Sequence, residues 1–248
     1  MIKFPGCSSG SFNSKVIKES NNMAKRSKRY LESRKVVDTE KKYGINEAVK
    51  LLKSLKPAKF NESVEVAMKL GIDPKQSDQL IRGSISLPKG IGKSLKVIVF
   101  ASGEKAVIAK KAGADEVGAE DLVKKVEGGW VDFDVAISTS DMMRLVGKLG
   151  RILGPQGKMP SPKSGTVTDD IETAVKEFKA GKIEYRTDAG GNVHALVGKL
   201  SFTGADLEDN INTFVKHIVN SRPSSAKGEF VEKVSVSSTM SPGIMLQV

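Results

Sequence analysis

Apolar residues in the first third of the chain recur first at helical and then at strand spacing. Apolar side chains at positions 45, 48, 49, 52 and 55 predict an amphipathic helix, with Asn46 as its N-cap and Pro57 as its stop. Alternating apolar residues over 63–70 predict a half-buried strand, and a second strand is expected over 83–87. Two glycines after Pro88 then predict a hinge over 89–92.

From residue 96 onward, short apolar strands alternate with helices. We expect strands over 96–101, 115–117 and 134–138, and helices over 104–112, 120–126, 142–147 and 169–179. Strands that alternate with helices in this way form a parallel sheet covered on both faces. The pattern therefore predicts a compact, three-layer, Rossmann-like α/β unit.

After residue 182 the pattern returns to that of the first third. A hairpin is expected from strands over 183–187 and 192–197, then an amphipathic helix over 206–220 and strands over 230–237 and 244–248. Neither chain end carries enough elements to bury a core alone. We therefore predict an α/β protein in which residues 23–89 and 181–248 form a composite α+β domain. Residues 90–180 would form an inserted α/β domain on two glycine-bearing linkers that let the domains open and close.

The composition adds a strongly basic character. Forty Lys and Arg against 29 Asp and Glu give a formal net charge of +11 and a pI near 9.6. Such a charge points to a polyanionic partner, with nucleic acid as the leading candidate. Aromatic residues make up only 5% of the chain, which argues against recognition by rows of stacked bases. One cysteine and two histidines exclude cysteine-based zinc sites and all-histidine clusters.

Two segments are candidates for contact with phosphate. The basic segment 24–42 fits a solvated helix as well as an arm that lies on phosphates. Residues 1–22 before it are predicted to be a disordered leader, an organellar targeting segment being the weaker interpretation. The segment 142–167 contains five glycines, three prolines, five basic residues and no acid, which predicts a basic loop of defined shape. A solvated connection without a ligand fits that composition equally well.

The sequence contains no complete nucleotide-binding or catalytic motif. Residues 92–94 match the end of a phosphate-binding loop, but Leu87 occupies the place of its first glycine. No G-x-G-x-x-G turn follows the strand over 96–101. His217 is interpreted as structural, His194 as structural or as a ligand contact beside the hairpin, and Cys7 falls in the leader. We therefore predict no catalytic residues, no metal site, no cofactor and no enzymatic activity.

The segment around residue 150 also carries a specific signature. Residues 147–160 read Gly-Lys-Leu-Gly-Arg-Ile-Leu-Gly-Pro-Gln-Gly-Lys-Met-Pro, which resembles the signature of the first-numbered protein family of the large ribosomal subunit, the ribosomal protein L1 family, bacterial type. Similar blocks occur over 59–65, 82–88, 112–115, 163–167 and 237–240. The resemblance covers residue 23 to the C-terminus.

The resemblance implies a two-domain fold whose composite domain carries the main contact with the stalk of the large-subunit rRNA, while the inserted domain is more mobile. It implies an RNA-facing patch on two strands, formed by Lys59, Phe60, Glu62, Ser238, Thr239 and Met240. A second set surrounds the hairpin and consists of Arg186, Asp188 and His194. The basic loop would add a secondary set of Lys148, Arg151, Lys158 and Lys163.

The function implied by the resemblance is that of a structural rRNA-binding protein in the cytoplasm. It would bind the stalk, assist release of deacylated tRNA from the exit site and repress translation of its own mRNA. Its partners would be the stalk rRNA, exit-site tRNA, its own operon mRNA and other ribosomal components, with no membrane and a monomeric state off the ribosome. The alternatives are a nucleotide-using α/β enzyme and a duplex-DNA-binding protein.

Two departures from the family pattern bear on the site. Ser241 stands where the family usually has glycine, which affects how closely the backbone can approach RNA. Ala189 stands in the hairpin turn where a basic residue is expected, so one phosphate contact would be missing.

Overall fold

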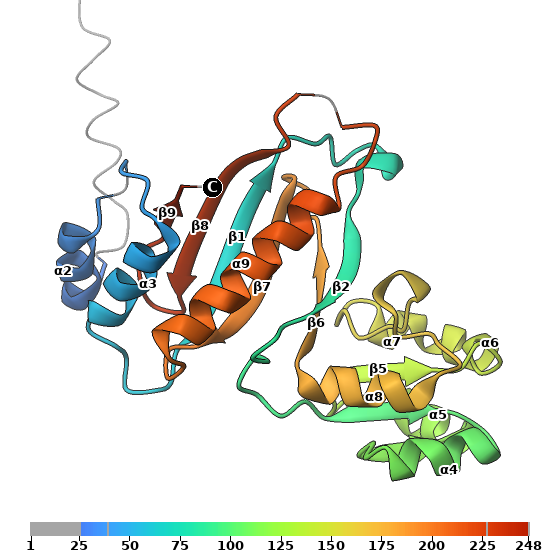
Figure 1. Cartoon of the computed structure of the whole chain (residues 1–248). Coiled ribbons are helices and arrows are strands. Elements are labelled where there is room, and N and C mark those ends of the chain that lie inside the picture. Colours follow the sequence, from blue (N-terminus) through green and yellow to red (C-terminus); the bar gives the residue numbers. More distant parts are fainter. Residues whose placement is uncertain (1–25, 39, 227, 248) are drawn as a thin grey trace, which may run out of the picture.

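The computed structural model describes residues 26–38, 40–226 and 228–247, and the predicted leader with Cys7 lies outside these residues. The larger part of the molecule is built on a four-stranded antiparallel sheet in the order β7-β1-β8-β9 (Figure 1). Its strands are β1 (Ser63–Leu70), β7 (Asn192–Lys199), β8 (Val231–Ser238) and β9 (Ile244–Leu246). Strands from both ends of the chain therefore share one sheet.

Helices cover one face of this sheet. α3 (Ile45–Ser54) and α9 (Gly204–Asn220) both pack on it, and α2 (Lys28–Val36) lies beyond α3 (Figure 1). The hydroxyl of Thr203 caps α9, and its residues Leu207, Ile211, Phe214 and Ile218 are fully buried along one side. The resulting core joins buried side chains of 37–91 to those of 183–246.

A smaller body is built on the parallel sheet β4-β3-β5. The central strand β3 (Val97–Phe100) is buried at every position and is flanked by β4 (Glu116–Gly118) and β5 (Val135–Ser138). Val97 and Val99 belong to the core under α4 (Glu104–Lys111) and α8 (Ile171–Ala180). Ile98 and Phe100 belong to the core under α5 (Glu120–Glu127) and the helical turns after β5. The predicted α/β fold, with a sheet covered on both faces, is confirmed.

The segment 142–167 is more helical than predicted. It contains α6 (Met143–Val146), η3 (Gly147–Leu149), α7 (Gly150–Leu153) and, after an irregular stretch, η4 (Pro162–Ser164). Leu149 and Leu153 are fully buried and belong to the core on the α5 side of the sheet. Because these leucines anchor the helical turns, the irregular loop begins only after α7.

The predicted hairpin forms only at its tip. Strand β6 (Lys182–Arg186) pairs along its length with β2 (Arg82–Ser86), and one bridge between Thr187 and Val193 joins its end to β7. The Thr187 hydroxyl accepts a hydrogen bond from the N–H of Ile81 and donates one to its carbonyl. These bonds fix the end of β6 beside β2, so the two-stranded ribbon β2-β6 forms separately from the main sheet.

The other differences between the predicted and the observed elements concern single caps and short segments. The predicted N-cap Asn46 lies inside the first turn of α3, whose cap is Gly44. The basic segment 24–42 contains the helix α2 over its described part, capped by the hydroxyl of Ser27. A short η2 (Ser77–Gln79) was not predicted, and β9 is shorter than expected. Among the described residues, no helix is long and apolar enough to cross a membrane.

The two chain connections between the bodies touch each other at glycines. Gly90 and Gly181 have positive φ of 63° and 109°, and a Cβ added to Gly181 would lie 2.6 Å from the Cα of Gly90. The fully buried Asn210 of α9 holds this point, because its amide accepts from the N–H of Lys89 and donates to the carbonyls of Gly90 and Val197. Both connections are therefore tied to the core of the larger body.

Replacing Gly181 with alanine should destabilise this junction. The left-handed backbone alone costs a residue with a Cβ about 1–2 kcal/mol, and the contact with Gly90 adds strain. We expect chemical denaturation to show at least this loss of unfolding free energy. Gly147→Ala serves as the control, because Gly147 has a helical φ of −54° and open space around its Cα. Equal stability of the two variants would contradict the prediction.

Candidate nucleic-acid interface

The loops before β1 and after β8 meet at one end of the main sheet. Val64 pairs with Ser238 in the antiparallel register. Beyond this pair, the N–H of Thr239 donates to the carbonyl of Ser63, and the N–H of Ser63 donates to the Thr239 hydroxyl, both at 3.0 Å. The predicted patch residues therefore lie together, but in the loops flanking the strands, apart from Ser238, which ends β8.

Glu62 does not face outward as predicted. Its side chain is buried, and its carboxylate accepts hydrogen bonds from the N–H of Ala58 at 2.6 Å, the N–H of Met240 at 3.3 Å and the hydroxyl of Ser238. Burial by itself would raise the pKa of Glu62, but these hydrogen bonds outweigh it and lower the pKa. Glu62 and the buried Ser238 therefore hold the two loops together from inside.

Four other patch residues are exposed above this support. Phe60 and Met240 are 54% and 48% exposed, among the most exposed large apolar side chains of the described residues, and Lys59 and Thr239 are also exposed. Neighbouring loops with an unpaired aromatic ring, a flexible thioether and a cation offer stacking, packing and charge to a ligand. These are the interactions that unstacked RNA bases and sugars use on proteins.

The Ser241 side chain closes the turn instead of projecting from it. Its hydroxyl accepts from the N–H of Ser238 at 2.8 Å and donates to the carbonyl of Pro242 at 3.1 Å. We expect Ser241→Gly to lower the unfolding free energy by about 0.5–1.5 kcal/mol, the usual contribution of one hydrogen bond. RNA affinity should stay within twofold in a binding titration, and a large gain in affinity would show that the hydroxyl obstructs RNA.

The second predicted set lies at the other end of the same strands. His194 pairs with Ala67, and Asn192 pairs with Lys69, whereas Ser63 pairs with Lys199. From Ser63 to Ala67, which lies opposite His194, four residues along the strand correspond to roughly 13 Å, so the two sets do not form one compact patch. They instead mark the two ends of an extended footprint.

Asp188 mainly organises its own turn. Its carboxylate accepts from the N–H groups of Gly190 and Asn192 and from the Asn192 side chain, and the Asn192 contacts are the main cause of its lowered pKa. The exposed His194 places its Nε2 3.8 Å from this carboxylate. Arg186 is exposed at the end of β6.

The four side chains of the secondary basic set differ in their surroundings. Lys148, Arg151 and Lys163 are exposed, whereas the ammonium of Lys158 donates to the carbonyl of Val131 at 2.9 Å and lies 5.1 Å from the centre of the Phe133 ring. Lys158 therefore stabilises the smaller body, unlike the prediction, which assigned it to phosphate.

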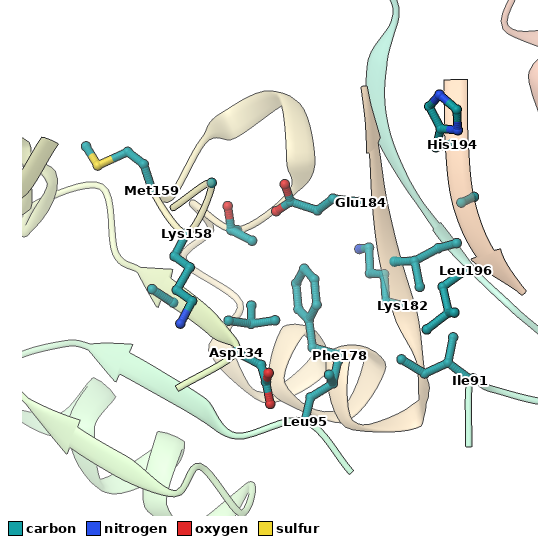
Figure 2. Close-up of a pocket in the computed structure, with 16 residues that line it drawn as sticks. Ile91, Leu95, Asp134, Lys158, Met159, Phe178, Lys182, Glu184, His194 and Leu196 are labelled. Atoms are coloured by element: carbon teal, nitrogen blue, oxygen red, sulfur yellow. The ribbon is translucent and has the colours of Figure 1, made fainter. Parts of the chain in front are cut away.

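A cavity of about 280 Å³ lies between the bodies beside β6 (Figure 2). Its charged groups are largely engaged: Asp134 accepts from the Lys93 ammonium at 2.6 Å, and Lys182 pairs with Glu177 at 2.7 Å. Burial raises the pKa of Glu184, which projects from β6 into the cavity (Figure 2). Among the described residues, no group of three or more His, Cys, Asp or Glu is placed to hold a metal ion.

Comparisons with known proteins show which family the sequence matches. The family profile of the ribosomal protein L1p/L10e family matches residues 52–242. The chain is 55% identical over 224 residues to a protein of Kosmotoga olearia named large ribosomal subunit protein uL1, covering 90% of this chain and 97% of the relative. It is 56% identical over 223 residues to a protein of the same name from Thermosipho africanus, covering 90% and 96%. As the signature over 147–160 predicted, the chain belongs to the ribosomal protein L1 family.

Proposed function

We propose that the protein binds the stalk of the large-subunit rRNA through the loops before β1 and after β8. The observation that carries this proposal is the exposure of Phe60 and Met240 on two loops tied together by the buried Glu62. Large apolar side chains held outward on a rigid support are typical of binding surfaces. Because their support is already hydrogen-bonded, little ordering is needed when RNA binds.

The extended footprint supports recognition of a folded RNA. The Phe60 and Met240 loops lie at one end of β1, and Arg186 with His194 lies at the other. RNA helices are recognised mostly by their shape and by 2′-hydroxyl and phosphate contacts. Two separate contact points along β1 would therefore select an RNA whose backbone follows the same path.

We propose two domains with the boundaries predicted from the sequence. The composite domain would comprise 23–89 and 181–248, and the inserted domain 90–180. The separation of the hydrophobic cores supports these boundaries. One core joins buried residues of 37–91 to those of 183–246, whereas the other two cores lie within 97–178. Movement about Gly90 and Gly181 would let the two domains open before RNA binds and close as it binds.

On the ribosome, in the cytoplasm, we propose that the protein helps release deacylated tRNA from the exit site. Exit-site tRNA and other ribosomal components would be its further partners, and the protein would be monomeric off the ribosome. Binding of an rRNA-like site in its own operon mRNA would repress its translation. The net charge of +11 supports contact with several RNA partners.

The L1 family is one of ribosomal structural proteins, so the prediction that the chain is not an enzyme is confirmed by its membership. The alternative of a nucleotide-using α/β enzyme is therefore set aside.

A competition titration tests the proposed function. The full chain is titrated with a labelled stalk rRNA fragment at two salt concentrations, with a scrambled hairpin and duplex DNA as competitors. Specific recognition predicts that the stalk fragment is bound more tightly than either competitor and that the preference persists at the higher salt. Equal binding of all three, abolished by salt, would reduce the interaction to net charge.

A further inference from the structure

The end of the β2-β6 ribbon holds two arginines side by side. Arg82 and Arg186 are directly opposite each other in the antiparallel register. Side chains in such a pair share a face, and like charges there destabilise the sheet. Arg82 has one long ion pair, 3.9 Å to Glu184, and the guanidinium of Arg186 makes no hydrogen bond or ion pair within the described residues. The protein alone leaves this repulsion largely uncompensated.

A third cation reaches the same place from the smaller body. Lys163 of η4 lines a cleft of about 780 Å³ together with Arg82 and Arg186. Its ammonium, too, has no partner among the residues that the structure describes. The carboxylate of Asp188, also in the cleft, is occupied by its own turn. Three cations thus face a cleft with one engaged acid.

We propose that this cleft binds one phosphate group of the RNA backbone, held by Arg82 and Arg186 from one body and by Lys163 from the other. The proposal rests on the proposed RNA-binding function and adds a contact to it. Guanidinium groups bind phosphate oxygens in a bidentate manner, so a shared phosphate turns the repulsion between the arginines into attraction.

The lining identifies a backbone phosphate as the ligand rather than a free nucleotide. None of the lining residues is aromatic, so the cleft offers no ring on which a base could stack; its apolar lining consists of Pro74, Leu80, Ile81, Pro162 and Ala189. The cleft is also open and large enough to admit a strand. The base would therefore lie outside, while the phosphate enters.

The cleft that holds the three cations lies where the two bodies meet. η4 belongs to the segment that forms the smaller body but packs against β2, and β2 and β6 form the ribbon whose residues Ile85, Ile183 and Tyr185 belong to the larger core. A single phosphate in contact with all three cations strengthens this contact between the two sides. RNA binding through this cleft therefore restricts the opening of the bodies.

The first test measures the salt dependence of stalk-RNA affinity for the full chain, the double variant Arg82→Ala/Lys163→Ala, and the single variant Lys163→Ala. Lys111→Ala is the matched control, because Lys111 is an exposed lysine at the end of α4 in the smaller body, outside the cleft. Each neutralised phosphate contributes roughly 0.7–0.9 to the slope of log K against log salt. Melting curves establish that each variant is folded.

We expect the double variant to lose roughly 0.7–0.9 of the slope, one phosphate, and Lys111→Ala to keep the slope of the unmodified chain. Lys163→Ala should lose part of that slope without disturbing the β2-β6 ribbon. An unchanged slope in the double variant overturns the proposal, and a loss of two phosphates or more overturns the single shared site. If the unmodified chain itself fails to prefer stalk RNA over the scrambled hairpin, the proposed function fails instead.

A second readout follows the distance between the bodies. Spin labels are placed through Asp209→Cys on α9 and Glu127→Cys on α5 in a Cys7→Ser background, both positions being exposed. Stalk RNA should narrow the distance distribution of this labelled chain. The narrowing should be lost when Arg82→Ala/Lys163→Ala is added at saturating RNA. Equal narrowing with and without the two substitutions would show that the cleft does not bridge the bodies.

Discussion

Glu62→Gln is expected to lower both the stability of the larger body and its affinity for RNA. A Gln side chain keeps one acceptor oxygen, whereas the carboxylate of Glu62 serves the N–H of Ala58, the N–H of Met240 and the Ser238 hydroxyl. In either orientation the amide NH₂ would face a main-chain N–H, that of Ala58 or that of Met240, donor against donor. Hydrogen bonds to buried charged groups contribute ~1.5–3 kcal/mol each, so we expect a loss of about 2–3 kcal/mol of unfolding free energy.

The loosened loops should also bind RNA at least tenfold more weakly, since a loss of about 1.4 kcal/mol corresponds to a factor of ten. Denaturant unfolding and a stalk-RNA titration measure the two effects. Glu65→Gln is the control, because Glu65 is an exposed residue of β1. If Glu62→Gln and Glu65→Gln match the unmodified chain, the carboxylate does not hold the loops together.

The pH dependence of the unfolding free energy tests the contribution of the Glu62 carboxylate separately. The folded pKa of Glu62 lies below its ordinary value of 4.5, so its contribution to stability is fully present above that value. The contribution is lost as the pH falls below 4.5 and through the folded pKa. The stability difference between the unmodified chain and Glu62→Gln should therefore shrink in acid. A constant difference across this range would contradict the assignment.

Removing the two apolar anchors should affect binding and leave folding intact. Phe60→Ala and Met240→Ala are each expected to weaken stalk-RNA binding by on the order of 1–3 kcal/mol, the scale of one stacking or packing contact. Both side chains are about half exposed, so little core packing is lost. The double variant should lose more than either single variant, while the slope against salt stays the same because no phosphate contact is removed.

Val107→Ala provides the comparison for these variants, since Val107 is 54% exposed on α4, on the smaller body. Its affinity for the stalk fragment should equal that of the unmodified chain. Should Phe60→Ala and Met240→Ala bind as tightly as Val107→Ala, with unchanged melting temperatures, these two residues would not belong to the RNA site.

The sequence predicted the elements whose pattern is local. Strand β1 was predicted with its exact bounds, because alternating apolar residues over 63–70 record the two faces of a strand directly. The alternation of strands and helices over 96–179 likewise predicted the covered parallel sheet. Asn46 was wrong as a cap because Gly44 already begins α3, and a glycine cap leaves little signal in a sequence.

The differences between the predicted and observed surroundings of the site residues have another origin. Glu62 looks like a surface residue in the sequence, and its burial depends on donors at 58, 238 and 240, most of them distant along the chain. Lys158 is likewise engaged by Val131. Arg82 was not among the predicted site residues, because its place opposite Arg186 depends on the β2-β6 register, which the sequence pattern did not predict. The surroundings of these three side chains are set by contacts with residues distant in the sequence. The local pattern of apolar and polar residues does not reveal such contacts.

The order of strands in the main sheet determines when the protein becomes functional during its synthesis. β3, β4 and β5 lie within 97–138, and α8, which covers one face of their sheet, ends at Ala180, so the smaller body can fold while later residues are still being added. β1, in contrast, pairs with β7 and β8, which are both made after α8. The loops that carry Phe60 and Met240 therefore meet only after the strands of the smaller body have already been made, so the proposed RNA site is assembled later than the smaller body.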